Sequence, residues 1–291
     1  MLEADLISLD PTVENYAVFG NPVKHSKSPQ IHSLFAKQTG LSLKYQAIEV
    51  PLDNFSGYVK TFSSQGGKGL NITIPFKEEA CSICSSLTER AELAGSVNTI
   101  WFGKGSTIYG DTTDGQGLIN DLSVNHSLNL KNKSLLVLGA GGSVKAILEP
   151  LLRLEPARAV LVNRTLSKAE SLSKKFSKKD KIKICSYSDL STQSFDLIIN
   201  GTSLSLQGEL PPLPDNILNN NSCCYDLMYS DEPTVFMNWA LQHGASLVLD
   251  GLGMLVEQAA ESFNIWHGIK PSTKPIIELL RNNQIDGDVG C

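Results

Sequence analysis

Apolar and polar positions change their period several times along the chain, and these changes predict alternating strands and helices. Residues 16–19 and 133–138 are short apolar runs of the kind that buried strands show. Residues 29–38 show helical spacing instead, with Ser28 as the expected N-cap, Pro29 at the first helical position and Gly40 just past the end. Repeated alternation of the two patterns is typical of an α/β protein with mainly parallel sheets.

The remaining segments extend this pattern and divide the chain into two domains. Further strands are expected at residues 43–50, 69–74, 98–102, 107–110, 159–162, 182–185, 197–200, 223–225 and 246–249, and further helices at residues 55–63, 76–87, 254–267 and 274–281. Residues 1–113 are expected to form most of a first domain, residues 114–250 a Rossmann-type nucleotide-binding domain, and residues 251–291 helices that return to the first domain. Residues 1–15 are expected to be a flexible tail.

The charge balance argues against a role in nucleic-acid binding. Of the 291 residues, 41% are hydrophobic and 19% are charged, and the net charge is −5. Such values are typical of a globular protein with a sizeable core, and a mildly acidic chain lacks the clustered cations that phosphate backbones need. The one lysine-rich stretch, residues 174–183, is interpreted as a solvated helix end, and a weak positive field beside an anionic cofactor is the alternative.

Targeting signals and metal-ligand spacings are also missing from the sequence. The first ten residues show neither the basic nor the apolar part of a signal peptide, and no apolar run of about 18 residues could span a membrane. The protein is therefore expected in the cytoplasm, where its cysteines stay reduced. Cys81 and Cys84 form a CxxC pair, but no second pair follows and the histidines have no ligand spacing, so no metal site is predicted.

The sharpest local motif is a glycine cluster between an apolar strand and a helix. Residues 135–146 read LLVLGAGGSVKA, in which the turn consists of Gly139, Ala140, Gly141, Gly142 and Ser143. Glycines permit a tight turn and a close approach of the backbone to a pyrophosphate, and the helix N-terminus supplies positive potential. Val144 departs from the third glycine of the dinucleotide fingerprint, but the strand–turn–helix context still predicts a dinucleotide site.

The end of the next strand favours NADP over NAD. An NAD site usually places an acidic residue there, about 20 residues after the glycine turn, to bind the ribose 2′-hydroxyl. This chain has Asn163, Arg164 and Thr165 at that place, followed by Lys168 one helical turn later. The guanidinium of Arg164 can pair with a 2′-phosphate, which NADP alone carries.

Two polar motifs in the first domain suggest an anionic, hydroxylated substrate. Ser26 and Ser28 place two hydroxyls at a predicted helix N-terminus, where a carboxylate is favoured. Asn71 and Thr73 share one side of a short strand, which favours a lined pocket over a core.

A lysine and an aspartate complete the set of candidate catalytic residues. Lys77 falls in the first turn of a predicted helix, where its charge opposes the helix dipole and a purely structural role is disfavoured. Asn98 begins a predicted strand, and Asp114 follows the next one, near a helix start. A Lys–Asp pair can hold and deliver a proton at a carbonyl that undergoes hydride transfer.

The ordered set of motifs resembles the shikimate dehydrogenase family. The matching segments are SKS, GLNITIPFK, GSVNT, DTTDG, GAGG, NRT, NGTS, YDLMY and DGLGMLVEQAA, from about residue 16 to about residue 267. The resemblance implies a reversible reduction of 3-dehydroshikimate to shikimate with NADPH, in chorismate and aromatic amino-acid biosynthesis. It also implies an N-terminal substrate domain and a Rossmann-type NADP-binding domain.

The resemblance further assigns roles residue by residue. It implies carboxylate binding by Ser26, Ser28 and Thr73, binding of the ring hydroxyls by Asn71, Asn98, Asp114 and Gln258, and catalysis by Lys77 and Asp114. It implies that Tyr229 closes on the substrate, that Asn163, Arg164, Thr165 and Lys168 clamp the adenosine phosphate, and that Thr202, Ser203, Leu227, Gly251 and Met254 lie on the nicotinamide side.

Three alternatives stay open at this point. A quinate/shikimate dehydrogenase of broader cofactor use is one, although Arg164 argues against a preference for NAD. A folate-type dehydrogenase of similar fold is another, against which the complete Ser-x-Ser and Lys–Asp set argues. A non-catalytic NADP-binding sensor would be expected to lack Lys77 or Asp114, and both are present. A homodimer is a further expectation.

Overall fold

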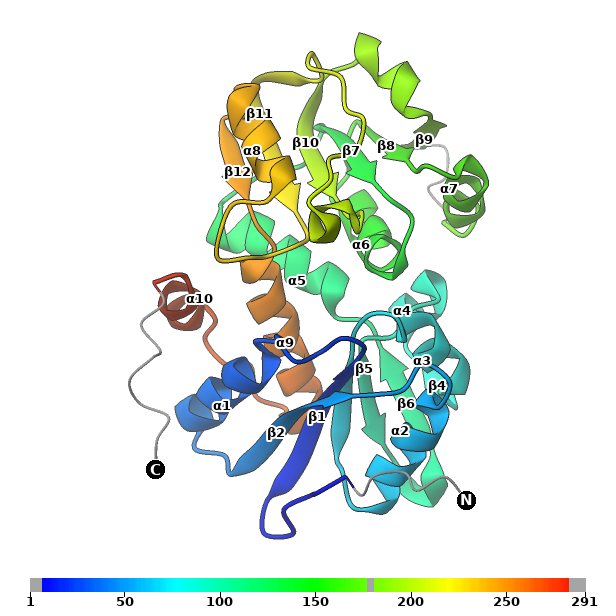
Figure 1. The fold of residues 1–291 in the computed structure, drawn as a ribbon, viewed down its shortest axis with the longest axis vertical. Coiled ribbons are helices and arrows are strands. Elements are labelled where there is room, and N and C mark those ends of the chain that lie inside the picture. The colour runs from blue at the N-terminus through cyan, green and yellow to red at the C-terminus, as the bar shows by residue number, and fades with distance from the viewer. Residues whose placement is uncertain (1–6, 177–180, 283–291) are drawn as a thin grey trace. The chain divides into compact units, whose positions relative to one another are not determined.

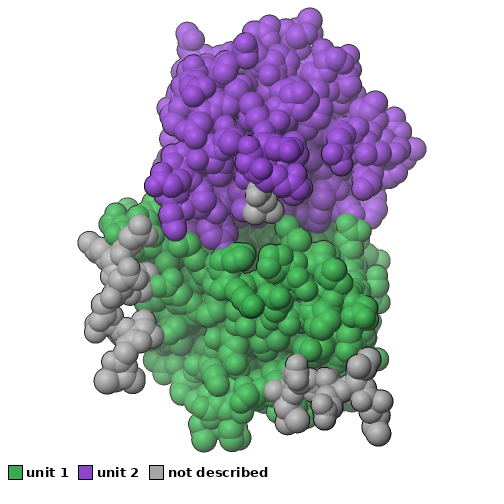
Figure 2. Space-filling model, in the orientation of Figure 1, with its two compact units in different colours: residues 1–117, 255–291 green, residues 118–254 purple. Residues whose placement is uncertain are grey.

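The computed structural model describes residues 7–176 and 181–282 (Figure 1). The chain divides into two compact units, which Figure 2 draws in green and purple. Unit 1 comprises residues 1–117 and 255–291, and unit 2 comprises residues 118–254. Unit 1 is therefore made from two pieces of chain that are far apart in sequence.

Unit 1 is built on a six-stranded mixed sheet with the order β2-β1-β3-β5-β6-β4. Its strands are β1 (Glu14–Gly20), β2 (Leu43–Glu49), β3 (Gly69–Ile72), β4 (Ser86–Leu87), β5 (Thr99–Phe102) and β6 (Ile108–Asp111). The pairs β1–β2, β1–β3 and β4–β6 are parallel, whereas β5 pairs antiparallel with both β3 and β6. A hairpin turn that contains Gly103 and Gly105 connects β5 to β6.

The helices of unit 1 come from both pieces of its chain. They are α1 (Ser28–Thr39), α2 (Phe55–Ser64), α3 (Lys77–Ile83), α4 (Glu89–Ala94), α5 (Asp114–Asn120), α9 (Leu252–His267) and α10 (Lys274–Arg281), of which α5 and α9 each contain a unit boundary. The helix predicted over residues 76–87 ends early, because the backbone turns extended at Cys84 and the next residues form β4.

The start of α1 differs from the prediction by one residue. Lys27 already has right-handed helical backbone angles and occupies the N-cap position, where no side chain caps the first turn. Ser28 is therefore the first helical residue, and the predicted N-cap role of Ser28 is wrong. Gly40 ends the helix with a φ of 72°, as its missing Cβ allows.

The apolar core of unit 1 reaches further toward the N-terminus than predicted. Ile7 is buried in this core together with Phe19, Phe55 and Phe62. The side chain of Asn15 is buried and donates to the carbonyl of Val13 at 2.9 Å. The prediction of a flexible tail is thus wrong for residues 7–15, because a buried isoleucine and a loop-closing asparagine hold them; residues 1–6 of that tail lie outside the described residues.

Unit 2 is a parallel six-stranded sheet with the order β12-β11-β10-β7-β8-β9. Its strands are β7 (Ser134–Leu138), β8 (Arg158–Val162), β9 (Ile182–Cys185), β10 (Phe195–Asn200), β11 (Leu218–Asp226) and β12 (Leu247–Leu249). The chain winds outward from β7 on one side and from β10 on the other. This is the doubly wound order of dinucleotide-binding folds, in which ligands bind at the carboxyl ends of the two central strands.

In the part of unit 2 that the structure describes, three α-helices connect strands. They are α6 (Gly142–Arg153), α7 (Leu166–Ser173) and α8 (Val235–Gln242). Lys174 and Lys175 are exposed at the end of α7, whereas Lys178 and Lys179 of the same lysine-rich stretch lie outside the described residues. Within the described residues, every helix is too short or too polar to cross a lipid bilayer.

Candidate active site

Lys77 and Asp114 form an ion pair in unit 1. Each residue is the first of its helix, α3 for Lys77 and α5 for Asp114. The Nζ of Lys77 donates to Oδ2 of Asp114 at 2.5 Å, and the two side chains are only 14% and 6% exposed. A short, shielded pair of this kind holds an ammonium donor in a fixed direction.

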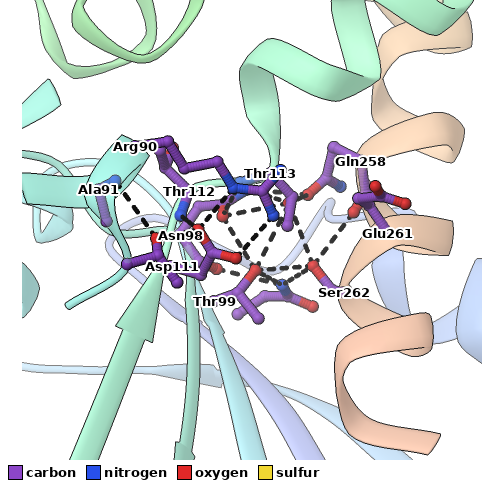
Figure 3. Close-up of polar contacts among 12 residues, drawn as sticks. Arg90, Ala91, Asn98, Thr99, Asp111, Thr112, Thr113, Gln258, Glu261 and Ser262 are labelled. Atoms are coloured by element: carbon purple, nitrogen blue, oxygen red, sulfur yellow. Dashed lines mark hydrogen bonds and ion pairs between the residues drawn. The ribbon is translucent and has the colours of Figure 1, made fainter. Parts of the chain in front are cut away.

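Asn98 fixes the other oxygen of Asp114. Its Nδ2 donates to Oδ1 of Asp114 at 2.8 Å and to Oε1 of Gln258 at 3.0 Å. Its Oδ1 accepts from the backbone N–H of Thr113 at 2.8 Å. Figure 3 shows Asn98, Thr113 and Gln258 turned toward one another, so that the residue before β5, the turn before α5 and helix α9 meet at one amide.

A layer of buried hydroxyls connects this group to Asn71. The Oγ of Ser262 lies 2.7 Å from Oγ1 of Thr99 and 3.2 Å from Oγ1 of Thr113 (Figure 3). Nδ2 of Asn71 donates to Oγ of Ser262 at 3.0 Å. Asn71, Asn98, Asp114 and Gln258, which the resemblance assigns to the ring hydroxyls, are therefore brought together.

The serine motif is tied to the same cluster through a tyrosine. The hydroxyl of Tyr45 donates to Oδ1 of Asn71 at 2.7 Å. Burial raises the pKa of Tyr45, and a hydrogen bond with Ser28 opposes that rise. The backbone N–H of Ser28 donates to Oγ of Ser26 at 3.2 Å. Thr73 is held through its backbone, whose N–H donates to the carbonyl of Phe19 at 2.9 Å.

An aromatic stack lies behind Tyr45. The ring of His32 is parallel to that of Tyr45, with 4.1 Å between centroids and 4° between planes. His32 lies one turn after Ser28 on α1 and also contacts Trp266 of α9. Burial lowers the pKa of His32 to about 3, and the neighbouring His267 adds to this shift, so the ring is neutral.

In unit 2, the glycine turn joins β7 to α6. Gly139 has a φ of 105°, and a Cβ on it would lie 2.8 Å from the carbonyl oxygen of Gly201, which follows β10. A Cβ on Gly141 would meet nothing within 4 Å. The turn therefore brings the ends of the two central strands together and leaves open space beside the first residues of α6, which suits a pyrophosphate. Ala140, Gly142 and Ser143 complete the turn, and none of the three is fully buried.

The residues predicted for the adenosine phosphate follow β8. Arg164, Thr165 and Lys168 are exposed at the start of α7. The side chain of Asn163 donates to the carbonyl of Thr165 at 2.8 Å, which shapes the turn. The cations Arg164 and Lys168 are thus both exposed after β8, where a 2′-phosphate would need positive charge.

A buried aspartate organises the loops after β10 and β11. Asp226 accepts from Ser205 at 2.8 Å, from Thr234 at 2.7 Å and from the N–H of Met228 at 3.1 Å. Burial raises the pKa of Asp226, and these hydrogen bonds oppose the rise.

The predicted nicotinamide-side residues lie along or beside these loops. They are Thr202 and Ser203 after β10, Leu227 after β11, and Gly251 and Met254 around the start of α9. Tyr229, which the resemblance assigns to the substrate, also follows β11. Thr202 donates to Oδ1 of Asn200 at 2.8 Å, and the N–H of Met254 donates to the hydroxyl of Tyr225 at 3.3 Å.

Comparison with known proteins identifies the family. Family models match at residues 18–100 (shikimate dehydrogenase substrate binding domain), 122–207 (shikimate/quinate 5-dehydrogenase) and 251–281 (shikimate 5′-dehydrogenase C-terminal domain). An NADP(+)-dependent shikimate dehydrogenase of Cellvibrio japonicus is 53% identical over 266 residues, which cover 91% of this chain and 96% of the relative. The chain belongs to the shikimate dehydrogenase family.

Solved structures agree with this membership. An Ael1 enzyme from Pseudomonas putida superposes with a TM-score of 0.85 at 42% identity, over 92% of this chain and 98% of that one. A shikimate 5-dehydrogenase from Thermus thermophilus, in complex with NADP(H) and shikimate, has a TM-score of 0.81 at 30% identity, over 92% and 99%. The predicted family and the predicted two-domain α/β fold are confirmed.

Several polar residues of the family site received no role from the sequence. Thr99 and Thr113 each neighbour a residue that did, inside the motifs GSVNT and DTTDG. Ser262 lies four residues after Gln258, so helical spacing would have placed both on one face of α9. Tyr45 gave no signal, because an aromatic residue in an alternating strand is ordinarily a packing residue.

Cys81 and Cys84, the CxxC pair, are both partly buried. Burial raises the pKa of the Cys84 thiol to about 12. Both pack against the core of unit 1. A thiol with a raised pKa is a weak nucleophile, because little of it is in the thiolate form.

Proposed function

We propose that this chain catalyses the reversible, NADP-dependent reduction of 3-dehydroshikimate to shikimate. The observation that carries the proposal is the Lys77–Asp114 pair, 2.5 Å apart and joined by Asn98 to a cluster of buried amides and hydroxyls. Such a cluster suits a ring with several hydroxyl groups, because each hydroxyl needs a positioned donor or acceptor. Relatives named NADP(+)-dependent shikimate dehydrogenase, at about half identity, support the proposal.

The substrate is assigned to unit 1. Ser26, Ser28 and Thr73 bind the carboxylate, with the N-terminal backbone of α1 adding positive potential. Asn71, Asn98, Asp114 and Gln258 bind the ring hydroxyls. Tyr229, from unit 2, is assigned to the substrate by the family motif YDLMY.

The cofactor is assigned to unit 2, whose residues fit NADP. The open space beside Gly141 and the exposed cations Arg164 and Lys168 suit a pyrophosphate and a 2′-phosphate. Thr202, Ser203, Leu227, Gly251 and Met254 are assigned to the nicotinamide side. When bound, NADPH supplies the hydride.

Proton handling falls to Lys77. Its ammonium donates to the carbonyl oxygen of the substrate and stabilises the negative charge that develops there. A proton then passes from Nζ to that oxygen, which completes the hydroxyl, and solvent reprotonates the amine. Asp114 holds the amine in place through Oδ2, while Asn98 holds Oδ1.

Purified chain, followed through the near-ultraviolet absorbance of NADPH, tests this proposal. Shikimate with NADP⁺ should give rapid reduction, while NAD⁺ and quinate should be poor replacements. Turnover of quinate with NAD⁺ would move the chain to the broader quinate/shikimate group. A folded chain that binds NADPH but turns over none of these pairs would refute the proposal.

Assembly and location are finer predictions. We expect the enzyme to act in the cytoplasm on its small-molecule substrate, and the homodimer stays a prediction. Size-exclusion chromatography with light-scattering detection gives the molecular mass in solution. A mass equal to that of a single chain would exclude the dimer.

A further inference from the structure

We infer that Arg90 and Asp111 form a positioning pair that sets the turn carrying Thr113 and Asp114. This inference rests on the proposed function, because it concerns the same Lys77–Asp114 chemistry. Neither residue belongs to the groups assigned above to substrate or cofactor.

The pair itself is bidentate. Nε of Arg90 donates to Oδ1 of Asp111 at 2.7 Å, and Nη2 donates to Oδ2 at 2.6 Å. Asp111 is only 3% exposed, whereas the guanidinium side chain is 33% exposed. Two parallel bonds fix both the position and the plane of the carboxylate, which a single bond would not do.

Two further donors lock the same carboxylate to the turn. Oδ1 of Asp111 accepts from the hydroxyl of Thr88 at 2.5 Å and from the backbone N–H of Thr112 at 2.7 Å. The bond to Thr112 places the anion directly on the main chain that leads to Thr113. Figure 3 shows Arg90 of α4 and Thr112 of the turn between β6 and α5 on either side of the Asp111 carboxylate. The same carboxylate also holds Thr88, the residue before α4.

The backbone of Asp111 also bonds to Asn98, a residue of the candidate site. The N–H of Asn98 donates to the carbonyl of Asp111 at 3.0 Å, while Oδ1 of Asn98 accepts from the N–H of Thr113 at 2.8 Å. Asn98 in turn donates to Oδ1 of Asp114 at 2.8 Å. The position of Asp114 is thus set by a chain of bonds that starts at Arg90, which itself touches none of the reacting groups.

Asn98 holds this turn at Thr113 and Asp114, and the Arg90–Asp111 pair holds it one residue earlier, at Thr112. When the pair is broken, Thr112 and Thr113 gain freedom and the Lys77 amine loses its fixed direction. Small displacements of a catalytic group lower the rate of the chemical step more than they lower binding, because the substrate keeps its other contacts. The pair should therefore act on kcat.

The test is steady-state kinetics of Arg90→Met, Arg90→Lys and Asp111→Asn, at saturating NADP⁺ and well below each melting temperature. We expect Arg90→Met to lower kcat by about 10- to 100-fold with a KM for shikimate within about threefold. Arg90→Lys, which keeps the charge but loses the fork, should fall between Arg90→Met and the parent. The kcat of the double variant Arg90→Met, Asp111→Asn should lie within about twofold of the kcat of the slower single variant, because the two residues act as one unit.

Arg158→Lys is the matched control. Arg158 bonds to Gln193 and to the carbonyl of Ser194, and its guanidinium lies 5.1 Å from the ring centre of Phe195, all within unit 2. Its replacement should lower the melting temperature and leave kcat unchanged. If Arg90→Lys and Asp111→Asn, as folded protein, keep kcat within about twofold of the parent, the pair is merely structural and the inference is overturned, whether or not Arg90→Met folds. If the parent chain itself shows no turnover, the proposed function fails instead, so the two failures are distinct.

Discussion

In unit 1 the side chains assigned to the substrate bond to one another, whereas in unit 2 the groups assigned to the cofactor are mainly backbone and exposed charge. Asn98 is buried and bonded on both its amide atoms, to Asp114, Thr113 and Gln258. Gly141, by contrast, offers open space, and Arg164 is exposed.

The difference teaches which kind of change each unit tolerates. A network of buried side chains fails when an atom is removed, because its partner is left unpaired in a region that water does not reach. A backbone turn fails when an atom is added, because glycine is chosen there for the space it leaves. Substitutions that remove side-chain atoms should therefore be most harmful in unit 1, and substitutions that add a methyl group should be most harmful in unit 2.

The largest effect is expected from Lys77→Ala. Loss of the proton donor should lower kcat by about 10²- to 10⁴-fold while the KM for shikimate changes far less. Lys60→Ala, at an exposed position on α2, is the control and should behave as the parent. A variant in which only KM rises would remove Lys77 from the catalytic role.

Arg164→Ala should give the next largest effect, and through charge rather than packing. The KM for NADPH should rise by about 10- to 100-fold while that for NADH stays nearly constant, because only NADPH carries the 2′-phosphate. Added salt should narrow the difference between parent and variant. Arg153→Ala, a 64% exposed arginine on α6, is the matched control. An equal rise in KM for NADPH and NADH would show that Arg164 does not bind the 2′-phosphate.

The two units also differed in how well the sequence predicted them. The glycine turn is contiguous in sequence, so one strand–turn–helix pattern was sufficient to place it after β7. Lys77 was found because a lysine in the first turn of a helix opposes the helix dipole. Asp114, 37 residues later, was found as a possible proton-handling partner of Lys77 and through the motif DTTDG.

What the sequence could not show were contacts without a local pattern. Arg90 and Asp111 are 21 residues apart, and each alone is an unremarkable charged residue. Ile7 was assigned to a tail because residues 1–15 match none of the family motifs, and only the fold shows that it enters the core. The N-cap assignment to Ser28 failed for a related reason: a serine before a helix satisfies the same preference whether the helix begins at it or after it.

Gly201→Ala tests the claim that added atoms are harmful in unit 2. A Cβ at this position would lie 2.4 Å from Cγ2 of Val144, which is fully buried, and 3.2 Å from the carbonyl oxygen of Leu138. The variant should lose about 1–3 kcal/mol of unfolding free energy in urea. Val144→Ala in the same chain should recover part of that loss, because it removes the methyl group that clashes.

Gly141→Ala adds the same methyl where nothing lies within 4 Å, and provides the control. Its unfolding free energy should stay close to that of the parent, while its KM for NADPH rises because the methyl enters the space assigned to the pyrophosphate. Equal stability losses at Gly201 and Gly141 would show that packing between the strand ends is not the cause.

The smallest effect concerns the buried ring behind the substrate cluster and its response to acid. The pKa of His32 is lowered from 6.5 to about 3, so below pH 6.5 the unfolded chain binds a proton that the folded chain does not. Stability that is present above pH 6.5 is therefore lost as the pH falls toward 3, at up to about 1.4 kcal/mol per pH unit.

His32→Gln cannot titrate, so urea unfolding at about pH 6 and about pH 5 should show a shallower decline for it than for the parent, by roughly 1 kcal/mol. His25→Gln, at an exposed position, should keep the parent's slope. Parallel declines for the parent and His32→Gln would mean that His32 takes up a proton in the folded protein, and that the interior behind the substrate cluster is open to water.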